Sequence, residues 1–270
     1  MNFATTTASH GADRGIADLV DRLGTSAPTL LSVWAHPDDE TYLGGGLTAE
    51  VAHRGGRVVN VTATLGEHGT DNPLHDPPAS LAKRRGSELI TALTVLGASA
   101  STVLGYEDGT CATIDDRIGA RRIASIVEEV RPDAVVSFGP DGVTGHPDHR
   151  AVARWTDQAL AGRDDAIPLL TTAAGAAWPP ELLERMHQVG AFWPDYPERT
   201  IDDPCWMIEL HGDRLDQKMA ALACHKSQIG SLQAALGPDD YRRLASSEAY
   251  RAANPSAVQL LAGIDRRHAA

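Results

Sequence analysis

Short apolar runs and amphipathic segments alternate along the first half of the chain. The apolar runs predict buried strands, and they lie at residues 30–35, 57–66, 101–106 and 133–139. The segments between them carry apolar side chains at helical spacing, and they lie at residues 43–56, 81–97 and 115–130. This β-α-β-α-β-α-β order predicts a Rossmann-like α/β fold, in which helices cover both faces of a mostly parallel sheet.

We expect one domain, residues 1–270. The segments before and after the alternating region predict their secondary structure less clearly. An amphipathic stretch at 13–24 predicts a helix within an N-terminal tail of residues 1–28. Residues 178–204 are rich in proline and tryptophan, and they predict an irregular extension that covers the pocket or a partner surface, or that adds to the core. Beyond it we expect a strand and three helices, at residues 206–210, 213–229, 241–254 and 257–270.

Composition narrows the range of partners. The 270 residues carry a formal net charge of −12 and contain no block of lysine or arginine, which argues against a nucleic-acid or anionic-membrane partner. The chain has no apolar run long enough to span a bilayer, and residues 1–15 lack the pattern of a secretory signal, so we expect a cytoplasmic protein. Its three cysteines are widely spaced, which indicates neither a disulfide framework nor a metal knuckle.

Two polar clusters follow strands of the expected sheet. "HPDDE" follows the first strand and "GPDGVTGHPDH" follows the fourth, so both are expected at the carboxyl edge of the sheet, where open α/β sheets bind ligands. His36 and Asp39 are three residues apart, as are His146 and His149. Two histidines and one carboxylate form a common ligand set for catalytic zinc. In either cluster alone these side chains could equally be helix caps, but two such clusters favour a metal site.

The motifs "AHPDDE" and "GHPDH" resemble those of the LmbE-like or PIG-L family of zinc-dependent N-deacetylases. The resemblance covers residues 29–228 and includes "RGSELITALTVLG", "LGYEDG" and "KMAALACHKSQ". Members of this family remove acetyl groups from N-acetylglucosamine conjugates or cleave related amides, so the resemblance implies a small sugar conjugate as substrate. It also implies zinc ligation by His36, Asp39 and His149, with Asp38 as the general base.

The residue types suit these roles. Two neutral imidazoles and one carboxylate leave a divalent ion with a net charge near +1, which favours the ionisation of water near neutral pH. Zinc is the expected ion, but iron(II) and cobalt also accept this ligand set. Asp38 is expected to take a proton from water, and His146 to stabilise the oxyanion or protonate the leaving nitrogen, with Asp148 orienting its imidazole. Either Asp38 or His146 can be the general acid.

Four further residues are expected near the substrate. The resemblance implies that Arg85 contacts the distal sugar or cyclitol and that Asp108 binds its hydroxyls, although each could be an ordinary surface side chain. His225 matches a late family histidine and is expected near the pocket, with a purely structural role as the alternative. Members that act on the mycothiol precursor have an oxyanion-donating tyrosine where this chain has Thr144. The shorter hydroxyl weakens the case for that particular substrate.

Other functions fit parts of the pattern. The stretch "LGGGL" follows a strand, but its consecutive glycines lack the spacing of a dinucleotide-binding loop. A non-enzymatic protein that keeps the metal and only binds a sugar conjugate is a further alternative. Binding alone would not need the proton-transfer pair Asp38 and His146, so their presence argues against it. An amidase for a different small amide, such as a thiol conjugate, stays open, as does a homo-oligomeric assembly.

Overall fold

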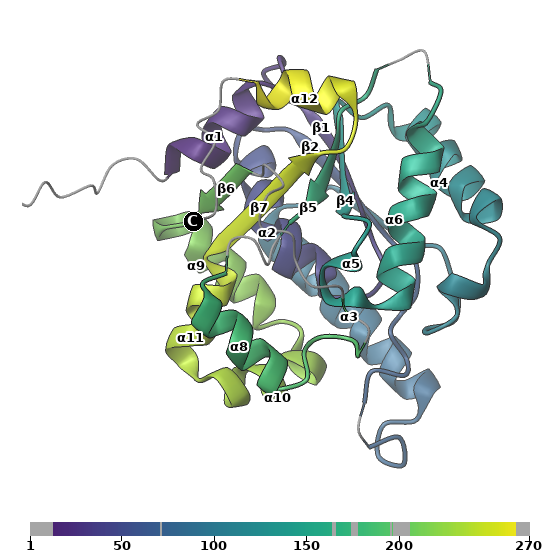
Figure 1. The fold of residues 1–270 in the computed structure, drawn as a ribbon, viewed down its shortest axis with the longest axis vertical. Helices are drawn as coiled ribbons and strands as arrows, with labels where there is room; N and C mark the ends of the chain where they lie inside the picture. Colours follow the sequence, from purple (N-terminus) through teal and green to yellow (C-terminus); the bar gives the residue numbers. More distant parts are fainter. Residues whose placement is uncertain are drawn as a thin grey trace, which may run out of the picture.

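The computed structural model has a seven-stranded sheet at its centre (Figure 1). It describes residues 13–70, 72–163, 166–173, 178–194, 196 and 206–262. Within these residues the strand order is β3-β2-β1-β4-β5-β7-β6. The strands are β1 (Thr29–Trp34), β2 (Arg57–Thr62), β3 (Ala100–Val103), β4 (Ala134–Phe138), β5 (Leu169–Thr172), β6 (Trp206–Glu209) and β7 (Ser247–Ala252).

The sheet is mostly parallel, which confirms the predicted fold class. The five strands from β3 across to β5 all run in one direction, and β7 pairs antiparallel with both β5 and β6. Nearly all side chains of β1 and β4 are buried, because helices cover both faces of these central strands. Since β1 and β4 are parallel neighbours, the loops that follow them emerge at the same edge of the sheet.

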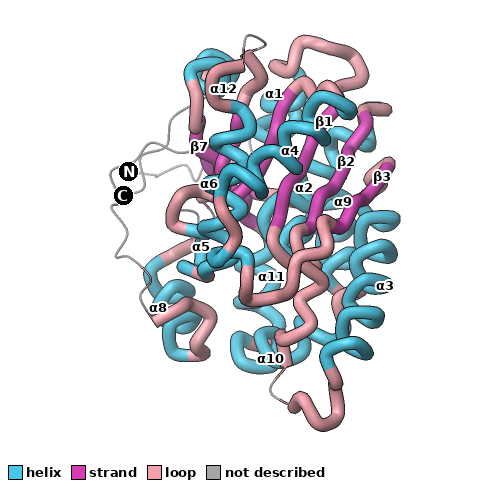
Figure 2. The backbone as a smooth tube through the Cα atoms, turned by 90° about the vertical axis from the view of Figure 1, so that its right-hand side faces the viewer, coloured by secondary structure: helices cyan, strands magenta, loops and turns pink. Residues whose placement is uncertain are grey.

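Helices cover both faces of the sheet (Figures 1 and 2). Helices α4 and α6 pack together on one face, and α2, α3 and α9 pack on the other. Helices α8, α10 and α11 lie together in the lower left of Figure 1, where Arg185 of α8 pairs with Asp240 of α11. The helices are α1 (Asp13–Asp21), α2 (Asp39–His53), α3 (Pro78–Leu96), α4 (Asp116–Val130), α5 (Gly142–Gly145), α6 (Pro147–Leu160), α8 (Pro180–Gln188), α9 (Gly212–Leu222), α10 (Lys226–Leu236), α11 (Pro238–Ala245) and α12 (Pro255–Leu261).

Several C-terminal elements differ from the prediction. The helix expected at 213–229 is broken into α9 and α10, because His225 leaves the helical conformation and turns its imidazole onto Glu40. The prediction of a helix at 241–254 is wrong beyond Ala245, because the chain there forms β7, which lies between β5 and β6. Strand β5 is absent from the prediction altogether.

The segment 178–204 is not irregular throughout. Its residues Pro180–Gln188 form helix α8, and the buried Leu182 and Met186 pack into the core, as one of the sequence alternatives allowed. Residues 195 and 197–204 of this segment lie outside the described residues. So do residues 263–270 of the helix expected at 257–270.

Helix α2 is anchored by close packing and by a buried ion pair. A Cβ at Gly46 would lie 2.6 Å from Leu210, and one at Gly45 would lie 3.2 Å from Lys218. Lys218 Nζ lies 2.8 Å from Glu248 Oε1, and both side chains are fully buried. Glu248 also accepts the backbone N–H of Gly46 (2.6 Å). The glycines of "LGGGL" therefore serve helix packing, and they fix the helix whose first turn carries the first polar cluster.

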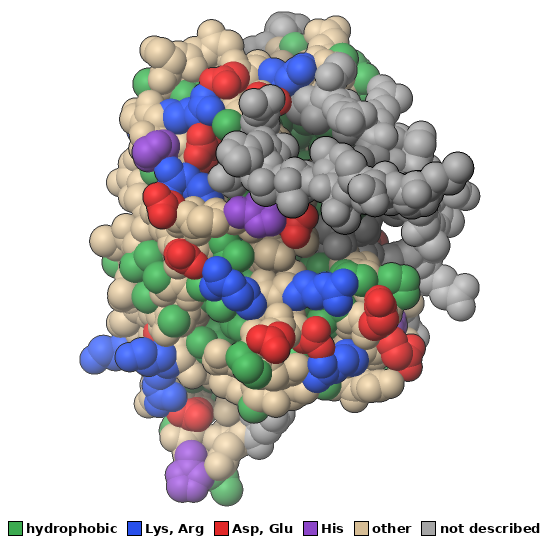
Figure 3. Space-filling view, turned by 90° about the vertical axis from the view of Figure 1, so that its left-hand side faces the viewer, with side chains coloured by type: hydrophobic (Ala, Val, Ile, Leu, Met, Phe, Trp, Pro, Cys, Tyr) green, Lys and Arg blue, Asp and Glu red, His purple; other side chains and the backbone are tan. Residues whose placement is uncertain are grey.

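Two features of the described residues bear on the expected partners, namely the length of the helices and the charge pattern of one face. None of the described helices is both long and apolar enough to cross a membrane. On the face drawn in Figure 3, basic and acidic side chains are interspersed, which agrees with the lack of lysine or arginine blocks in the sequence. Cys111 and Cys224 are free thiols, and Cys205 lies outside the described residues.

Candidate metal centre and active site

The loop between β1 and α2 carries the first cluster. Strand β1 ends at Trp34 and α2 begins at Asp39, so the chain turns sharply at the edge of the sheet. The backbone N–H of His36 donates to Asp39 Oδ2 (2.8 Å), which holds these two residues close together. Asp38 is the N-cap residue of α2, and its φ of 110° lies in a region that non-glycine residues rarely adopt.

The loop between β4 and α6 carries the second cluster. His146 caps α6, because its Nδ1 accepts a hydrogen bond from the backbone N–H of Asp148 (3.1 Å). His149 stacks on Phe138, the last residue of β4, with ring centroids 4.2 Å apart. His149 Nδ1 lies 2.9 Å from the carbonyl oxygen of Gly142 and donates to it, since a carbonyl only accepts. In neutral His149 the other nitrogen, Nε2, is therefore unprotonated.

Three ligand atoms converge between the two loops. His36 Nδ1 lies 3.1 Å from His149 Nε2 and 3.6 Å from Asp39 Oδ2. His149 Nε2 lies 3.5 Å from Asp39 Oδ1. These separations are close to the ~3.3 Å that separates ligands bound at about 2.0–2.1 Å in a tetrahedral site. All three side chains are buried, so the cluster is already arranged as a metal site requires.

The hydrogen-bond pattern of this cluster also fits a cation at its centre. His36 Nε2 lies 3.1 Å from Asp108 Oδ1 and 3.4 Å from Asp148 Oδ2, and it donates to these carboxylates. Neutral His36 then has an unprotonated Nδ1, which faces the unprotonated Nε2 of His149. Two lone pairs at this distance need a proton or a metal ion between them, and buried Asp39 adds a negative charge. The donor set fits a divalent metal bound by two nitrogens and a carboxylate.

The pKa values of the three residues follow from this arrangement. Burial alone would raise the pKa of Asp39, but His149 and His36 hold it well below its usual range. Burial lowers the pKa of His149. Burial also opposes protonation of His36, but the hydrogen bonds to Asp108 and Asp148 raise its pKa well above the usual value. Asp39 is thus held in its ionised form and His149 in its neutral form, as a metal site would require.

His36 also belongs to two other close groups, one with His146 and His149 and one with Asp108 and Asp148. The two carboxylates lie on the Nε2 side of His36, where they orient its imidazole and fix its tautomer. Asp108 thus lies on the side of the His36 ring that faces away from His149. Contact of Asp108 with substrate hydroxyls stays a prediction.

Asp148 contacts His36 and His146 in different ways. Its fully buried carboxylate bonds to His36 Nε2 and to the backbone N–H groups of Gly109 (2.8 Å) and Cys111 (3.0 Å). Its bond to His146 is made by the backbone N–H. The sequence interpretation, in which the Asp148 carboxylate orients His146, differs from this geometry because the carboxylate points towards His36.

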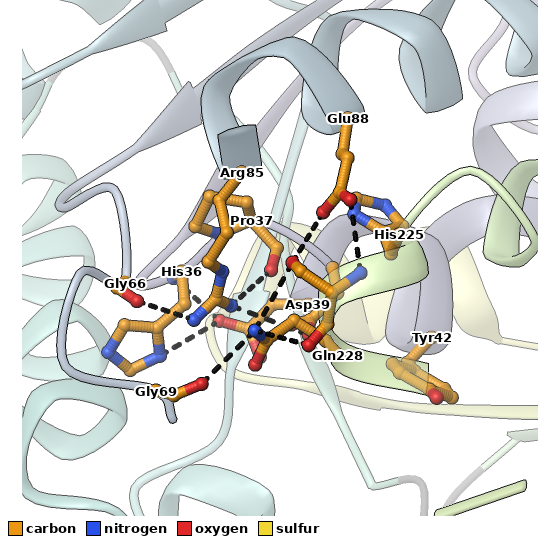
Figure 4. Close-up of polar contacts among 12 residues, drawn as sticks. His36, Pro37, Asp39, Tyr42, Gly66, Gly69, Arg85, Glu88, His225 and Gln228 are labelled. Atoms are coloured by element: carbon orange, nitrogen blue, oxygen red, sulfur yellow. Dashed lines mark hydrogen bonds and ion pairs between the residues drawn. The ribbon is translucent and has the colours of Figure 1, made fainter. Parts of the chain in front are cut away.

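Arg85 is buried beside Asp38. It lies on α3, its Nη1 donates to the carbonyl of Gly66 (2.8 Å), and its Nη2 donates to the carbonyl of Pro37 (2.7 Å) (Figure 4). Asp38 Oδ2 lies 3.5 Å from Nη2. Arg85 is only 4% exposed, so it is not an ordinary surface arginine. Burial raises the pKa of Asp38 to about 6, with Arg85 opposing the rise and Asp39 adding to it.

His146 lies next to two ligand histidines and at the rim of the site. Its ring centroid is 4.8 Å from that of His36, 4.9 Å from that of His149 and 4.7 Å from that of Trp193. Burial lowers the pKa of His146 to about 4, and the neighbouring histidines add to this effect. Because Nδ1 accepts the N–H of Asp148, the neutral ring carries its proton on Nε2. His146 is therefore a neutral hydrogen-bond donor.

His225 lies beside the first turn of α2 (Figure 4). Its Nε2 lies 3.0 Å from Glu40 Oε1 and 3.2 Å from Thr41 Oγ1. The other oxygen of Glu40 accepts the backbone N–H of Asp38 (2.9 Å). Burial opposes protonation of His225, but Glu40 raises its pKa above the usual value. His225 thus contacts the loop of the metal ligands through Glu40.

Thr144 lines a cavity of about 590 Å³ beside Asp39 and His149. Its Oγ1 lies 3.5 Å from His149 Nδ1, and its carbonyl accepts the backbone N–H of Trp193 (2.8 Å). Sequence reasoning missed both this cavity and Trp193. The signal that pointed towards them was the proline-rich and tryptophan-rich composition of residues 178–204, which gives no contacts by itself.

The fold and the ligand cluster together define an α/β protein with a candidate metal centre at the carboxyl edge of its sheet. Residues 31–160 match the model of a family described as PIG-L, GlcNAc-PI de-N-acetylase, and both motifs lie within the match. The 1D-myo-inositol 2-acetamido-2-deoxy-alpha-D-glucopyranoside deacetylase of Kineococcus radiotolerans is 32% identical over 247 residues, which cover 74% of this chain and 68% of that protein. The chain belongs to the PIG-L family, which confirms the resemblance in the motifs.

Solved structures share the fold at lower sequence identity. The N,N'-diacetylchitobiose deacetylase from Pyrococcus horikoshii superposes with a TM-score of 0.58 at 19% identity, over 96% of this chain and 97% of that one. The 4-carboxy-2-hydroxymuconate hydratase GalB from Pseudomonas putida gives a TM-score of 0.56 at 20% identity, over 84% and 97%. These similarities show the fold alone. Since a deacetylase and a hydratase share it, the reaction has to be argued from the side chains.

Proposed function

We propose that this protein is a metal-dependent hydrolase that cleaves the amide of an N-acetylglucosamine-type conjugate, giving a free amine and a carboxylic acid. The observation that carries this proposal is the convergence of ligand atoms from His36, Asp39 and His149. Asp38 on the same loop and His146 in ring contact complete the set needed for hydrolysis. Family membership and a relative named as a deacetylase support both the reaction and the amino sugar.

His36, Asp39 and His149 would hold the metal, and we propose zinc, although iron(II) or cobalt suits the same ligands. When bound, the ion would polarise the amide carbonyl and lower the pKa of water. Asp108 and Asp148 hold His36 in the tautomer that leaves Nδ1 free for the metal.

Asp38 acts as the general base in this proposal. Its pKa of about 6 leaves it mostly ionised at neutral pH, so it can take the proton of the attacking water. The same pKa makes the protonated carboxyl acidic enough to return that proton to the leaving nitrogen. Its side chain is only 18% exposed, which limits competition from bulk water for the proton.

His146 acts as the oxyanion donor in this proposal. Its lowered pKa keeps the imidazole neutral at pH 7, with the proton on Nε2. A neutral imidazole donates a hydrogen bond well but is a poor acid, so we assign the return of the proton to Asp38. Thr144 offers a shorter hydroxyl than the tyrosine of relatives for the mycothiol precursor, so we do not carry the inositol group over to this chain.

The test compares wild type with Asp38→Asn on a panel of N-acetylglucosamine conjugates, with released amine as the readout. Asparagine keeps the shape of the side chain but cannot take a proton. The variant is expected to bind one metal per chain and to release amine at least about a hundredfold more slowly. Asp157→Asn, at an exposed position of α6, is the matched control and should keep the wild-type rate.

Two outcomes would contradict the proposal. Equal rates for wild type and Asp38→Asn would remove Asp38 as the base and leave His146 as the candidate. Metal-loaded wild type that binds the conjugates but never releases amine would support the non-enzymatic binding protein instead.

A further inference from the structure

The cavity beside the candidate metal centre has mainly apolar walls. Its volume of about 590 Å³ lies within the range of roughly 300–1,000 Å³ that is typical of small-molecule sites. Helices α2, α5, α8, α10 and α11 each contribute an apolar side chain to the wall, namely Leu43, Val143, Met186, Leu232 and Leu244. A single acetyl methyl group would leave most of this space unfilled.

Two of the three hydroxyl groups of the described wall, those of Tyr42 and Ser231, have partners within the protein, and the wall's Trp178 offers one unpaired indole N–H. Tyr42 Oη lies 2.9 Å from the hydroxyl of Tyr241, and Ser231 Oγ lies 3.5 Å from the carbonyl oxygen of Gln228. A sugar or cyclitol ring buried in this cavity would leave most of its own hydroxyls unpaired, which is unfavourable. An apolar group therefore suits this cavity better than a sugar ring does.

The cavity starts at the metal ligands themselves, since Asp39 and His149 are part of its wall. In the view of Figure 4, Asp39 lies between Tyr42, which lines the cavity, and Arg85 with its partner Gly66 on the other side. In this view the apolar cavity thus lies on the Tyr42 side of Asp39, away from Arg85.

This arrangement distinguishes the two ends of an N-acylated amino sugar. The acyl chain begins one bond from the carbonyl carbon that reacts at the centre, whereas the aglycone is separated from that carbon by the polar sugar ring. Only the acyl chain can enter an apolar cavity at the ligands without placing the sugar ring inside it. We propose that the cavity binds N-acyl chains longer than acetyl, such as hexanoyl or octanoyl, an inference that rests on the proposed amide hydrolysis.

The first experiment measures kcat/KM for glucosamine conjugates that differ only in the N-acyl group, from acetyl through butanoyl and hexanoyl to octanoyl. Each buried methylene is worth about a fourfold gain in binding. We expect hexanoyl to exceed acetyl at least about tenfold, mainly through a lower KM, because the chain is buried in both ground and transition states. A second series keeps N-acetyl and lengthens the aglycone from methyl to octyl, and it should show little change.

A variant that fills the cavity tests the site directly. Leu232 is half-buried on α10, at the edge of the core and in the cavity wall, so Leu232→Trp adds bulk at the cavity, and the acetyl activity of the variant reports whether the fold is kept. The variant is expected to lose at least about tenfold in hexanoyl hydrolysis and to keep acetyl hydrolysis within about threefold. Gln233→Trp, on the exposed face of the same helix, is the control. Titration calorimetry of the metal-loaded proteins with hexanoate gives a readout without turnover, and only Leu232→Trp should weaken its binding.

The outcomes separate this inference from the proposed function. Hydrolysis of acetyl conjugates with no gain for longer chains would overturn the inference and leave the function intact. A gain that follows the aglycone series would assign the cavity to the aglycone, which also overturns it. No amine from any conjugate would overturn both, and hexanoate binding that is unaffected by Leu232→Trp would show that the chain lies elsewhere.

Discussion

Asp38 has a backbone conformation that costs energy. Its φ of 110° lies in a region that favours glycine, and such strain persists where neighbouring groups fix it. Glu40 Oε2 accepts the N–H of Asp38 (2.9 Å), and the Arg85 guanidinium donates to the carbonyl of Pro37 (2.7 Å). Arg85 thus holds the loop that carries the proposed base, and it places a positive charge next to that base.

Arg85→Met is therefore expected to lower kcat more than it raises KM. The loop loses a clamp, and Asp38 loses the charge that opposes the rise of its pKa. The pKa of Asp38 then rises further, so less of the base is ionised at a given pH. The acid-side limb of the kcat/KM profile should move to higher pH, which rate measurements across this limb will show.

Two further variants separate positioning from substrate contact. Arg85→Lys keeps the charge and should restore part of the acid-side limb. Arg84→Met alters the more exposed neighbour that pairs with Asp76, and it should leave the profile unchanged. If Arg85→Met raises KM at constant kcat, with no shift of the profile, Arg85 contacts the substrate as the family resemblance implies.

At the scale of elements, the first half of the fold is predictable because its central strands β1, β2 and β4 are apolar runs and helices alternate with the strands. Strands β1 and β4 are buried along nearly their whole length, so their sequences carry the signal alone. Residues Ser247–Ala252 give no such signal, since their strand conformation depends on pairing with β5 and β6. The break at His225 depends in the same way on Glu40, almost two hundred residues earlier.

The convergence of the candidate metal ligands is predictable, because they directly follow strands whose parallel arrangement brings them together. The burial of Arg85 is not, since it depends on the carbonyl groups of Pro37 and Gly66, which no periodicity reveals. The apolar cavity is not predictable either. Its walls combine α2 and α5 with α8, α10 and α11, and a helical pattern does not say which helices meet.

Helix α2 provides a test of how tightly the site is anchored. Gly46→Ala would place a methyl group 2.6 Å from Leu210, so the core has to shift around the buried ion pair of Lys218 and Glu248. Overpacking of this kind costs about 1–3 kcal/mol. We expect a lower free energy of unfolding in urea, measured at a fixed metal concentration.

The matched control is a glycine in a helix with open space around it. A Cβ at Gly230 of α10 would meet no atom within 4 Å, so Gly230→Ala should stabilise the protein by about 0.5–1 kcal/mol through helix propensity. If Gly46→Ala is as stable as wild type, the packing of α2 against Leu210 is looser than these distances indicate.

At the scale of the whole molecule, the candidate metal centre joins two distant parts of the chain. His36 and His149 are 113 residues apart in sequence, and their nitrogens meet only because β1 and β4 are neighbours in the folded sheet. The unfolded chain has no such site, so a metal that binds here stabilises the folded state by mass action. Folding and metal occupancy are therefore coupled.

Metal addition to the chelator-treated protein is accordingly expected to raise its melting temperature. At a free zinc concentration about one hundred times Kd, the gain is about 2.7 kcal/mol, which corresponds to roughly 5–10 °C for a chain of this size. His149→Ala should abolish both the shift and stoichiometric zinc in a metal assay. His146→Ala should keep both, because His146 bonds to Asp148 and is not in the proposed ligand set. Loss of the shift in both variants would instead place His146 among the ligands, in the alternative group of His36, His146 and His149.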